Sequence, residues 1–308
     1  MAVQEKAKTV IIIAGPTAVG KTAVGIDIAR HFGTEIISAD SRQCFKELNI
    51  GVARPSADEL SQVPHHFIAS HFIHQKVTAA TFEAFALQKA EELFEAHDTV
   101  VMVGGTGLYI KAFCDGMDEI PEVPLSIHQE VVHGYSENGM EWLQGEIQRL
   151  DPVYWEKGET RNPQRMMRAL EVAKSTGRSI LHFQSGQKKQ RGFSVIKIAL
   201  DIPRQELHNN INHRVDRMME MGLVEEVKSL LPFQQLNALQ TVGYKELFAY
   251  LNGGSTLQNA VESIKANTRQ YAKRQLTWFR KDQAYTWHLP NANNVIHFLE
   301  KELEQKFQ

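Results

Sequence analysis

The sequence predicts an α/β fold in which a parallel sheet is flanked by helices, with a helical insertion. Short apolar runs that suit buried strands, at residues 10–14, 35–39 and 99–103, alternate with helical patterns. Such alternation is typical of a parallel sheet with helices on its faces. The alternation stops after residue 114, and a strand pattern returns at 195–200. We therefore predict a core of residues 1–114 and 193–308 that ends in helices, and a helical insertion domain of residues 115–192.

A phosphate-binding loop follows the first predicted strand. Residues 15–22 read Gly-Pro-Thr-Ala-Val-Gly-Lys-Thr, a complete G-x-x-x-x-G-K-T pattern, and a helical pattern starts at Ala23. Strand, loop and helix in this order are the structural context of a P-loop. Backbone N–H groups and the helix N-terminus bind anions there, Lys21 adds positive charge, and the Thr22 hydroxyl suits Mg²⁺. The core is therefore predicted to be a P-loop fold whose phosphate-binding residues are Gly15, Pro16, Thr17, Ala18, Val19, Gly20, Lys21 and Thr22.

The ends of the next two strands carry the other candidate groups. The carboxyl ends of parallel strands meet at the ligand crevice, so Asp40 is expected near the P-loop. Its carboxylate can bind Mg²⁺ or act as a general base, and an N-cap of the following segment is the alternative. The third strand runs into Gly104-Gly105-Thr106, where P-loop ATPases usually carry an acid. Its glycines would let a ligand approach the backbone, and the missing acid argues against ordinary ATP hydrolysis.

Composition and charge are those of an ordinary globular protein. The 308 residues are 43% apolar and carry a formal net charge of −2. No apolar segment precedes the first predicted strand and no run approaches the roughly 18 residues of a membrane helix, so we expect no signal peptide and no membrane span. The two cysteines, Cys44 and Cys114, cannot form a disulfide framework. These features predict a cytoplasmic protein.

The near-neutral total hides two basic segments. Residues 161–192 contain one acid, Glu171, and residues 265–281 contain none. Basic segments in a P-loop protein indicate a polyanionic partner such as nucleic acid, whereas a solvated helix face is the alternative explanation. The basic residues are Arg161, Arg165, Arg168, Lys174, Arg178, Lys188, Lys189 and Arg191 in the first segment, and Lys265, Arg269, Lys273, Arg274, Arg280 and Lys281 in the second.

Helical patterns dominate the insertion and the C-terminal third. We expect helices at 127–135, 139–150, 162–176 and 204–221, the third starting at an Asn162 N-cap and ending before Gly177. Arg214 in the last of these helices is a candidate phosphate clamp, with Arg217 as a competitor. On a helix through the second basic segment, Lys265, Arg269, Lys273 and Arg280 share one face, which we expect to be exposed, while Ile264, Tyr271 and Trp278 lie opposite and are expected to pack inward.

Four histidines, His65, His66, His71 and His74, lack the partners and spacing of a zinc site. We expect them to lie on the surface or to contact RNA.

Together these segments resemble the tRNA dimethylallyltransferase (tRNA isopentenyltransferase) family. They occur in the family's order and span nearly the whole chain, which makes the set far more specific than the P-loop alone. Cys44-Phe45 and Ser70 depart from the family's usual residues, and none of them is a proposed catalytic group. The matching segments are residues 15–22, 40–43, 50–55, 64–66, 104–109, 162–165, 240–245 and 268–275.

The resemblance implies transfer of a dimethylallyl group from dimethylallyl diphosphate to N6 of the adenosine 3′-adjacent to the anticodon in tRNA, giving N6-isopentenyladenosine. It implies that the P-loop binds the diphosphate with Mg²⁺ at Thr22, and that Lys21, Arg214 and Thr106 stabilise the leaving group. Asp40 would orient the adenine amine and accept its proton. A monomer is expected. The contacts made by the insertion would make it a tRNA-binding domain. The implied tRNA contacts are Asp40, Ser41, Arg42, Gln43, Gln164, Arg165, Met166, Met167, Arg168, Gln240, Thr241, Val242, Gly243, Tyr244, Lys245, Arg269 and Lys273.

Three other functions are compatible with parts of the sequence. A P-loop small-molecule kinase would not need the basic insertion. A cytokinin-type enzyme that prenylates free adenine nucleotides would not need its basic helix. A non-catalytic RNA-binding ATPase is disfavoured by the Gly-Gly-Thr at the end of the third strand.

Overall fold

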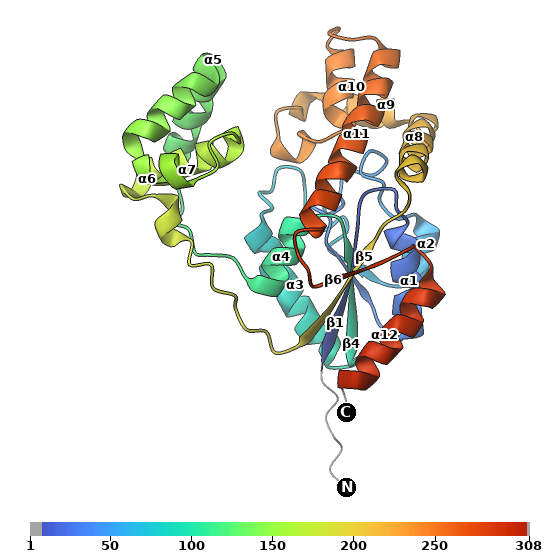
Figure 1. Cartoon of the computed structure of the whole chain (residues 1–308). Coiled ribbons are helices and arrows are strands. Elements are labelled where there is room, and N and C mark those ends of the chain that lie inside the picture. The colour runs from blue at the N-terminus through green and yellow to red at the C-terminus, as the bar shows by residue number, and fades with distance from the viewer. Residues whose placement is uncertain (1–7, 307–308) are drawn as a thin grey trace. The chain divides into compact units, whose positions relative to one another are not determined.

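The core is a six-stranded, wholly parallel sheet. The computed structural model of the chain describes residues 8–306 and orders the strands β3-β2-β4-β1-β5-β6 (Figure 1). The central strand is β1, in which Ile12 lies opposite Met102 of β4 and Lys197 of β5. All the strands expected from apolar runs are present, so the predicted P-loop α/β fold is confirmed. The strands are β1 (Thr9–Ala14), β2 (Ile36–Ser38), β3 (His65–His66), β4 (Thr99–Gly104), β5 (Ser194–Leu200) and β6 (Tyr285–His288).

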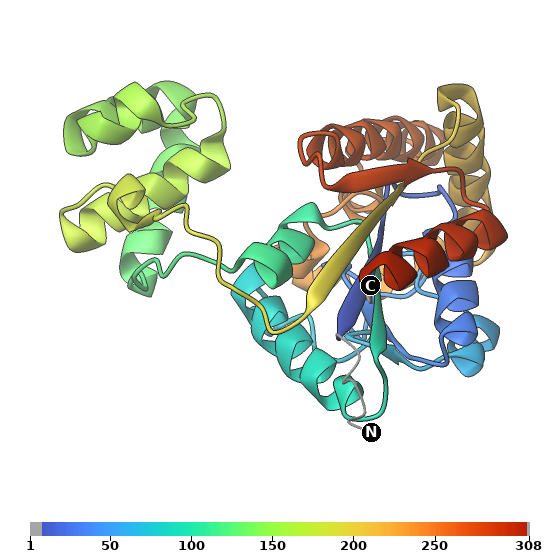
Figure 2. The same cartoon turned by 60° about the horizontal axis from the view of Figure 1, so that its bottom comes forward.

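Helices cover both faces of this sheet. Figures 1 and 2 show α1 and α12 on one face and α3 and α4 on the other. No helix among residues 8–306 is long and apolar enough to span a membrane. The helices of this part are α1 (Lys21–His31), α2 (Ala57–Gln62), α3 (Ala79–Phe94), α4 (Gly107–Asp115), α8 (Arg204–Glu220), α9 (Leu223–Ser229), α10 (Tyr244–Leu251), α11 (Leu257–Phe279) and α12 (Ala292–Lys306).

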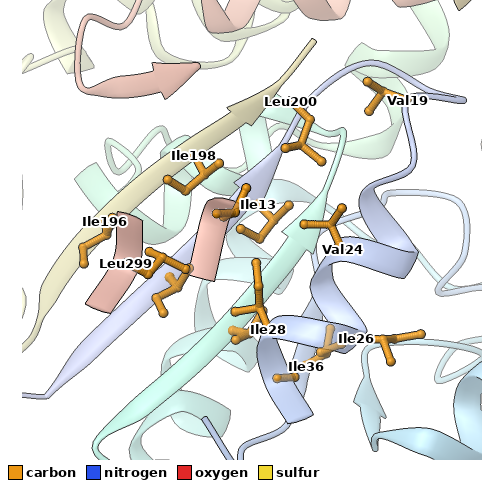
Figure 3. Close-up of a cluster of buried hydrophobic side chains, with 14 of the residues drawn as sticks. Ile13, Val19, Val24, Ile26, Ile28, Ile36, Ile196, Ile198, Leu200 and Leu299 are labelled. Carbon is orange, nitrogen blue, oxygen red and sulfur yellow. The ribbon is translucent and has the colours of Figure 1, made fainter. Parts of the chain in front are cut away.

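One face of the sheet is sealed by aliphatic side chains (Figure 3). Ile13 and Ile198 from neighbouring strands pack with Val24 and Ile28 of α1 and with Leu299 of α12, and all five are at most 3% exposed. Each such side chain stabilises the fold by about 1.5–3 kcal/mol on burial. The sheet is thereby fixed against α1, the helix that starts at the P-loop.

The chain divides into two compact units. The larger comprises the described residues up to Asp115 and from Gln190 on, and the smaller is Gly116–Lys189. The smaller unit ends at Lys189, three residues before the predicted boundary at 192. Arg191 belongs to the larger unit because its largely buried side chain donates to the carbonyls of Ala112 and Phe113 and pairs with Glu83 at 2.8 Å.

The smaller unit is helical and has its own core, which includes Val131, Leu143, Ile147 and Leu170. Its helices begin and end where local chemistry predicts. The Asn162 side chain accepts the Arg165 N–H, and Gly177 ends the helix with a φ of 69°. A non-helical Gly139, with a φ of 71°, divides the first helical stretch into the two helices expected there. The helices are α5 (Leu125–Leu150), α6 (Pro152–Lys157) and α7 (Pro163–Thr176).

The ends of β2 and β4 approach closely in the larger unit. The Ala39 N–H donates to the Val103 carbonyl, and the Thr106 N–H donates to the Ala39 carbonyl. A Cβ atom on Gly104 would lie 2.2 Å from the Ala39 oxygen, inside backbone that cannot move aside. Gly104 therefore allows the two strand ends to meet.

Gly104→Ala is expected to destabilise the larger unit by about 1–3 kcal/mol or more, the usual cost of overpacking. The matched control is Gly145→Ala in α5, where nothing lies within 4 Å of the added methyl group. That change should stabilise its helix by about 0.5–1 kcal/mol. Scanning calorimetry measures both, and equal shifts in the two unfolding transitions would contradict the steric argument.

Candidate active site

A cavity of about 890 Å³ lies where β1, β2 and β4 end. The P-loop, Asp40, the segment 49–60, α8 and α11 contribute to its lining. Three of the four predicted catalytic residues, Lys21, Asp40 and Arg214, come together here from three separate parts of the chain. The crevice expected from the strand order is therefore present, and its charged groups line the same cavity.

The P-loop has the backbone conformation of an anion cradle. Gly15 and Gly20 have φ angles of 145° and 97°, and Ala18 also has a positive φ of 65°. A Cβ on Gly15 would lie 2.7 Å from the Leu200 carbonyl of β5. Helix α1 then starts at Lys21, so its N-terminus and the loop amides serve the same site.

Two desolvated cations face the cavity. The Lys21 ammonium donates to the Pro16 carbonyl at 2.7 Å, and the Arg214 guanidinium donates to the Thr17 hydroxyl at 3.0 Å. Burial lowers the pKa of Lys21 to about 7, with the charge of Arg214 adding to the fall and that of Asp40 opposing it. Burial also lowers the pKa of Arg214. A multiply charged anion bound between two such cations would offset their mutual repulsion and favour their charged forms.

Asp40 is oriented by the backbone that follows it. Its Oδ1 accepts the N–H groups of Arg42 at 2.8 Å and Gln43 at 3.2 Å. The carboxylate thus closes a turn, which is close to the capping role considered as its alternative, and it also lines the cavity. The capping contacts do not use up the carboxylate, and its role as a base or Mg²⁺ ligand stays a prediction.

The glycines after β4 are explained by protein neighbours. A Cβ on Gly105 would lie 2.3 Å from Nε2 of Gln275, and one on Gly107 would lie 2.1 Å from Nε1 of Trp278. With Gly104 set against Ala39, each glycine accommodates another part of the chain. These neighbours are sufficient to require the glycines. Gly104 also lines the cavity, so the expected approach of a ligand to the backbone there stays a prediction.

Thr106 is tied to the Asp40 turn and does not itself line the cavity. Its Oγ1 accepts the Ser41 N–H at 3.0 Å and lies 3.3 Å from the Ser41 hydroxyl. Its hydroxyl also shares a hydrogen bond with that of Tyr271, which does line the cavity. Burial of the hydroxyl end raises the pKa of Tyr271 to about 12. The predicted contact between Thr106 and a leaving oxygen stays a prediction.

Sequence reasoning missed Gln275, which joins the P-loop to the turn after β4. Its Oε1 accepts the Thr17 N–H and its Nε2 donates to the Gly105 carbonyl, both at 2.9 Å. Gln275 is only 7% exposed. Nothing local could have shown this role, because Thr17 lies 258 residues away in sequence.

Two of the residues predicted to contact RNA near the site, Arg42 and Gln43, form hydrogen bonds to neighbouring loops of the protein. Arg42 donates to the carbonyls of Asn237 and Ala238, just before the segment 240–245, and Gln43 donates to the Ala53 carbonyl at 2.9 Å. Within 240–245, Gln240 and Lys245 are exposed. Their RNA contacts stay predictions.

Tyr244 is fully buried, so its predicted contact with tRNA is corrected to a structural role. Its hydroxyl donates to Glu226 at 2.6 Å, and the same carboxylate accepts the N–H groups of Ile50 and Gly51. This cluster fixes the segment 49–55 that lines the cavity.

In the smaller unit, Gln164 and Arg165 are exposed at the start of α7, as an RNA contact requires. Arg168 pairs with Glu171 at 3.3 Å and is partly exposed. Met166 and Met167 are buried in the core of the unit. Their side chains therefore serve packing, and their predicted contact with tRNA is corrected.

The orientation predicted for α11 is only partly right. Ile264 is buried and Arg280 is exposed, as expected. The Lys265 side chain is 15% exposed and pairs with Asp216 of α8 at 2.7 Å, while Arg269 donates to Asn212 at 2.7 Å. Tyr271 and Trp278, expected to pack inward, are each 37% exposed. Lys273 remains on the exposed side.

No group of three or more His, Cys, Asp or Glu side chains in the part of the chain described is placed to hold a metal ion. His66 pairs with Glu35 at 2.5 Å, and His65 Nδ1 lies 2.7 Å from the Val63 carbonyl. Thr22 lines the cavity next to Lys21. A single hydroxyl suits Mg²⁺, which keeps several waters and takes its other ligands from substrate phosphates.

We expect Gln275→Leu to lower the free energy of unfolding by about 2–4 kcal/mol, because it leaves the Thr17 N–H and the Gly105 carbonyl without their partner. The exposed Gln270 on the same helix supplies the matched control, Gln270→Leu. Urea unfolding compares the two. Similar losses in both variants would show that the amide bridge contributes nothing specific.

Comparison with known proteins assigns the family. A sequence model of the family described as IPP transferase matches residues 43–282. The tRNA dimethylallyltransferase of Christiangramia forsetii is 46% identical over 295 residues, covering 95% of this chain and 98% of that protein. The enzyme of the same name from Flavobacterium johnsoniae is 45% identical over 96% of this chain and 99% of its own.

Solved structures agree in fold. The full-length tRNA isopentenylpyrophosphate transferase of Bacillus halodurans matches with a TM-score of 0.72 and 32% identity, over 97% of this chain and 98% of that one. A eukaryotic dimethylallyltransferase described as acting on tRNA matches with a TM-score of 0.71 and 25% identity, over 88% of this chain and 70% of that one. With a family match over most of its length and relatives at this identity, the chain belongs to the IPP transferase family.

Proposed function

We propose that the protein transfers a dimethylallyl group from dimethylallyl diphosphate to N6 of the adenosine 3′-adjacent to the anticodon in tRNA. The observation that carries the proposal is the cavity in which a P-loop and two partly buried, desolvated cations face the Asp40 carboxylate. That arrangement suits a diphosphate beside a group that accepts a proton. Relatives that cover nearly the whole chain carry the name tRNA dimethylallyltransferase, which supports the same reaction.

The proposed reaction is a single displacement. The adenine N6 forms a bond to C1 of the dimethylallyl group, the C1–O bond to the diphosphate breaks, and a proton leaves N6 for Asp40. Lys21, Arg214 and the loop amides stabilise the charge that grows on the departing diphosphate, because they are fixed in place before the reaction. Asp40 is suited to accept the proton because Arg42 and Gln43 hold one of its oxygens in position.

Mg²⁺ is proposed at Thr22. When bound, it would neutralise part of the charge on the diphosphate. Thr106 is proposed to act near the leaving oxygen. We also propose that the protein acts as a monomer in the cytoplasm.

RNA contacts are proposed for Ser41, Arg42 and Gln43 beside the target base, for Gln164, Arg165 and Arg168 in the smaller unit, and for Gln240 and Lys245. Thr241 and Val242, which are partly exposed, would contribute through the backbone. The predicted contact of Gly243 is corrected to a structural role, because the residue is buried and its N–H donates to Glu246. Arg269 and Lys273 are proposed to contact phosphates. A base inside a stacked loop has to be extruded to reach a cavity of this kind.

Labelled dimethylallyl diphosphate, Mg²⁺ and unmodified tRNA test the reaction. Label is expected in the adenosine 3′ of the anticodon. Asp40→Asn keeps the hydrogen-bond acceptor for Arg42 and Gln43 and removes the base, so transfer should fall about 10²–10⁴-fold. The exposed Asp27 of α1 provides the control, Asp27→Asn, which should transfer at the wild-type rate. Label only in free adenine nucleotides, or turnover of ATP without transfer, would overturn the proposal.

The affinity for dimethylallyl diphosphate should fall as pH rises above 7. The pKa of Lys21 is about 7 in the free protein, and a bound anion raises it, so binding takes up a proton in this range. The affinity of the wild type should drop up to about tenfold per pH unit, relative to Lys21→Arg, which stays protonated. Calorimetric titration from pH 6 to 9 measures both proteins. Parallel pH profiles would show that Lys21 is already charged throughout.

A further inference from the structure

Helix α11 presents an aromatic and basic surface to solvent. Tyr271, Arg274 and Trp278 are three or four residues apart and therefore share one helix face. Tyr271 and Trp278 each leave 37% of their surface open, and Arg274 is exposed. The Arg274 guanidinium lies 5.7 Å from the centre of the Tyr271 ring. These three residues are called the α11 strip.

Both aromatic rings of the strip are held in place by the turn after β4. The Tyr271 hydroxyl is hydrogen-bonded to Thr106. The Trp278 indole lies against Gly107, where a Cβ atom would come within 2.1 Å of its nitrogen. Rings fixed in this way lose little conformational freedom when a ligand covers them, which favours binding.

The strip continues outward from the candidate active site. Tyr271 lines the cavity that holds Asp40. Trp278 follows seven residues later, about 10 Å further along the helix at 1.5 Å per residue. Stacked nucleotides in a strand advance by about 3.4 Å. A strand whose target base enters the cavity would therefore place bases one to three positions away over the strip.

Charge around the strip suits a polyanion. Residues 265–281 contain no acid, and Lys273, Arg274 and Lys281 are exposed. Aromatic faces beside arginine and lysine are the surface on which unpaired bases stack while their phosphates are neutralised. A protein partner that docked an apolar helix on the strip would leave these cations without negative charges to pair with, so RNA is the better occupant.

We propose that the α11 strip is a stacking platform for unpaired bases that flank the target adenosine in the RNA substrate. The inference rests on the proposed function, which supplies the RNA. Trp278 stacks on a neighbouring base, and Arg274 contacts a phosphate or the face of a second base. The strip thereby selects single-stranded loops over duplex RNA, since paired bases do not offer their faces.

The test uses an anticodon stem-loop RNA in which 2-aminopurine replaces one loop base at a time. Trp278→Ala is expected to weaken binding roughly tenfold and to abolish the change in 2-aminopurine fluorescence at one flanking position. Trp278→Phe should restore most of both. The dependence of affinity on salt should stay unchanged for Trp278→Ala and become shallower for Arg274→Ala if the arginine contacts a phosphate.

Thr277→Ala, an exposed neighbour on the same helix, is the matched control. The KM for dimethylallyl diphosphate and the melting temperature should be the same in Trp278→Ala and in the control, which excludes a folding defect. Affinity of Trp278→Ala equal to that of the control, or a loss that is also seen with duplex RNA, would overturn the platform. If the wild type transfers no label to tRNA, the proposed function fails, whereas the binding comparison still decides whether the strip stacks bases.

Discussion

The candidate site depends on one buried amide. Gln275 connects the Thr17 N–H of the P-loop with the Gly105 carbonyl after β4, so α11 joins the ends of two neighbouring strands. Shifting either loop would leave a buried polar group without a partner, at a cost of about 1–3 kcal/mol. The turn at Gly105 also carries Thr106, whose hydroxyl accepts the N–H of Ser41 beside Asp40. The amide therefore aligns the phosphate-binding side of the cavity with the carboxylate side.

The same cavity is electrostatically unbalanced before any anion enters. Lys21 and Arg214 are both desolvated, and burial lowers the pKa of each. For Lys21, only the negative charge of Asp40 acts in the other direction and raises the pKa. A site with this charge favours a ligand that becomes more negative during the reaction over one whose charge is constant. A departing diphosphate has that property, and the absence of an acid at the end of β4 keeps the positive potential high.

Much of the fold could be predicted because its signals are local. The P-loop at 15–22, the apolar strands and the Asn162 cap of α7 depend on neighbours within a few residues. The two short strands β3 and β6 were not predicted, because two to four residues carry no recognisable period. The orientation of helix α11 was predicted only in part, for a different reason. Periodicity shows which residues share a face, but the face that packs depends on distant partners, and here Asp216 holds Lys265.

The corrected orientation of α11 explains how a nearly neutral chain can present a basic surface. Where α11 packs against α8, Lys265 is paired with Asp216 and adds little to the outer field. Asn212 holds the Arg269 side chain by a hydrogen bond but leaves its charge uncompensated. Toward its C-terminal end, the helix turns Gln275 inward to the P-loop and its aromatic and basic residues outward. One helix thus carries the Gln275 bridge of the candidate site on one side and the α11 strip on the other. Because Gln275 and the strip belong to the same helix, a shift of α11 that moves the strip would also move the Gln275 amide.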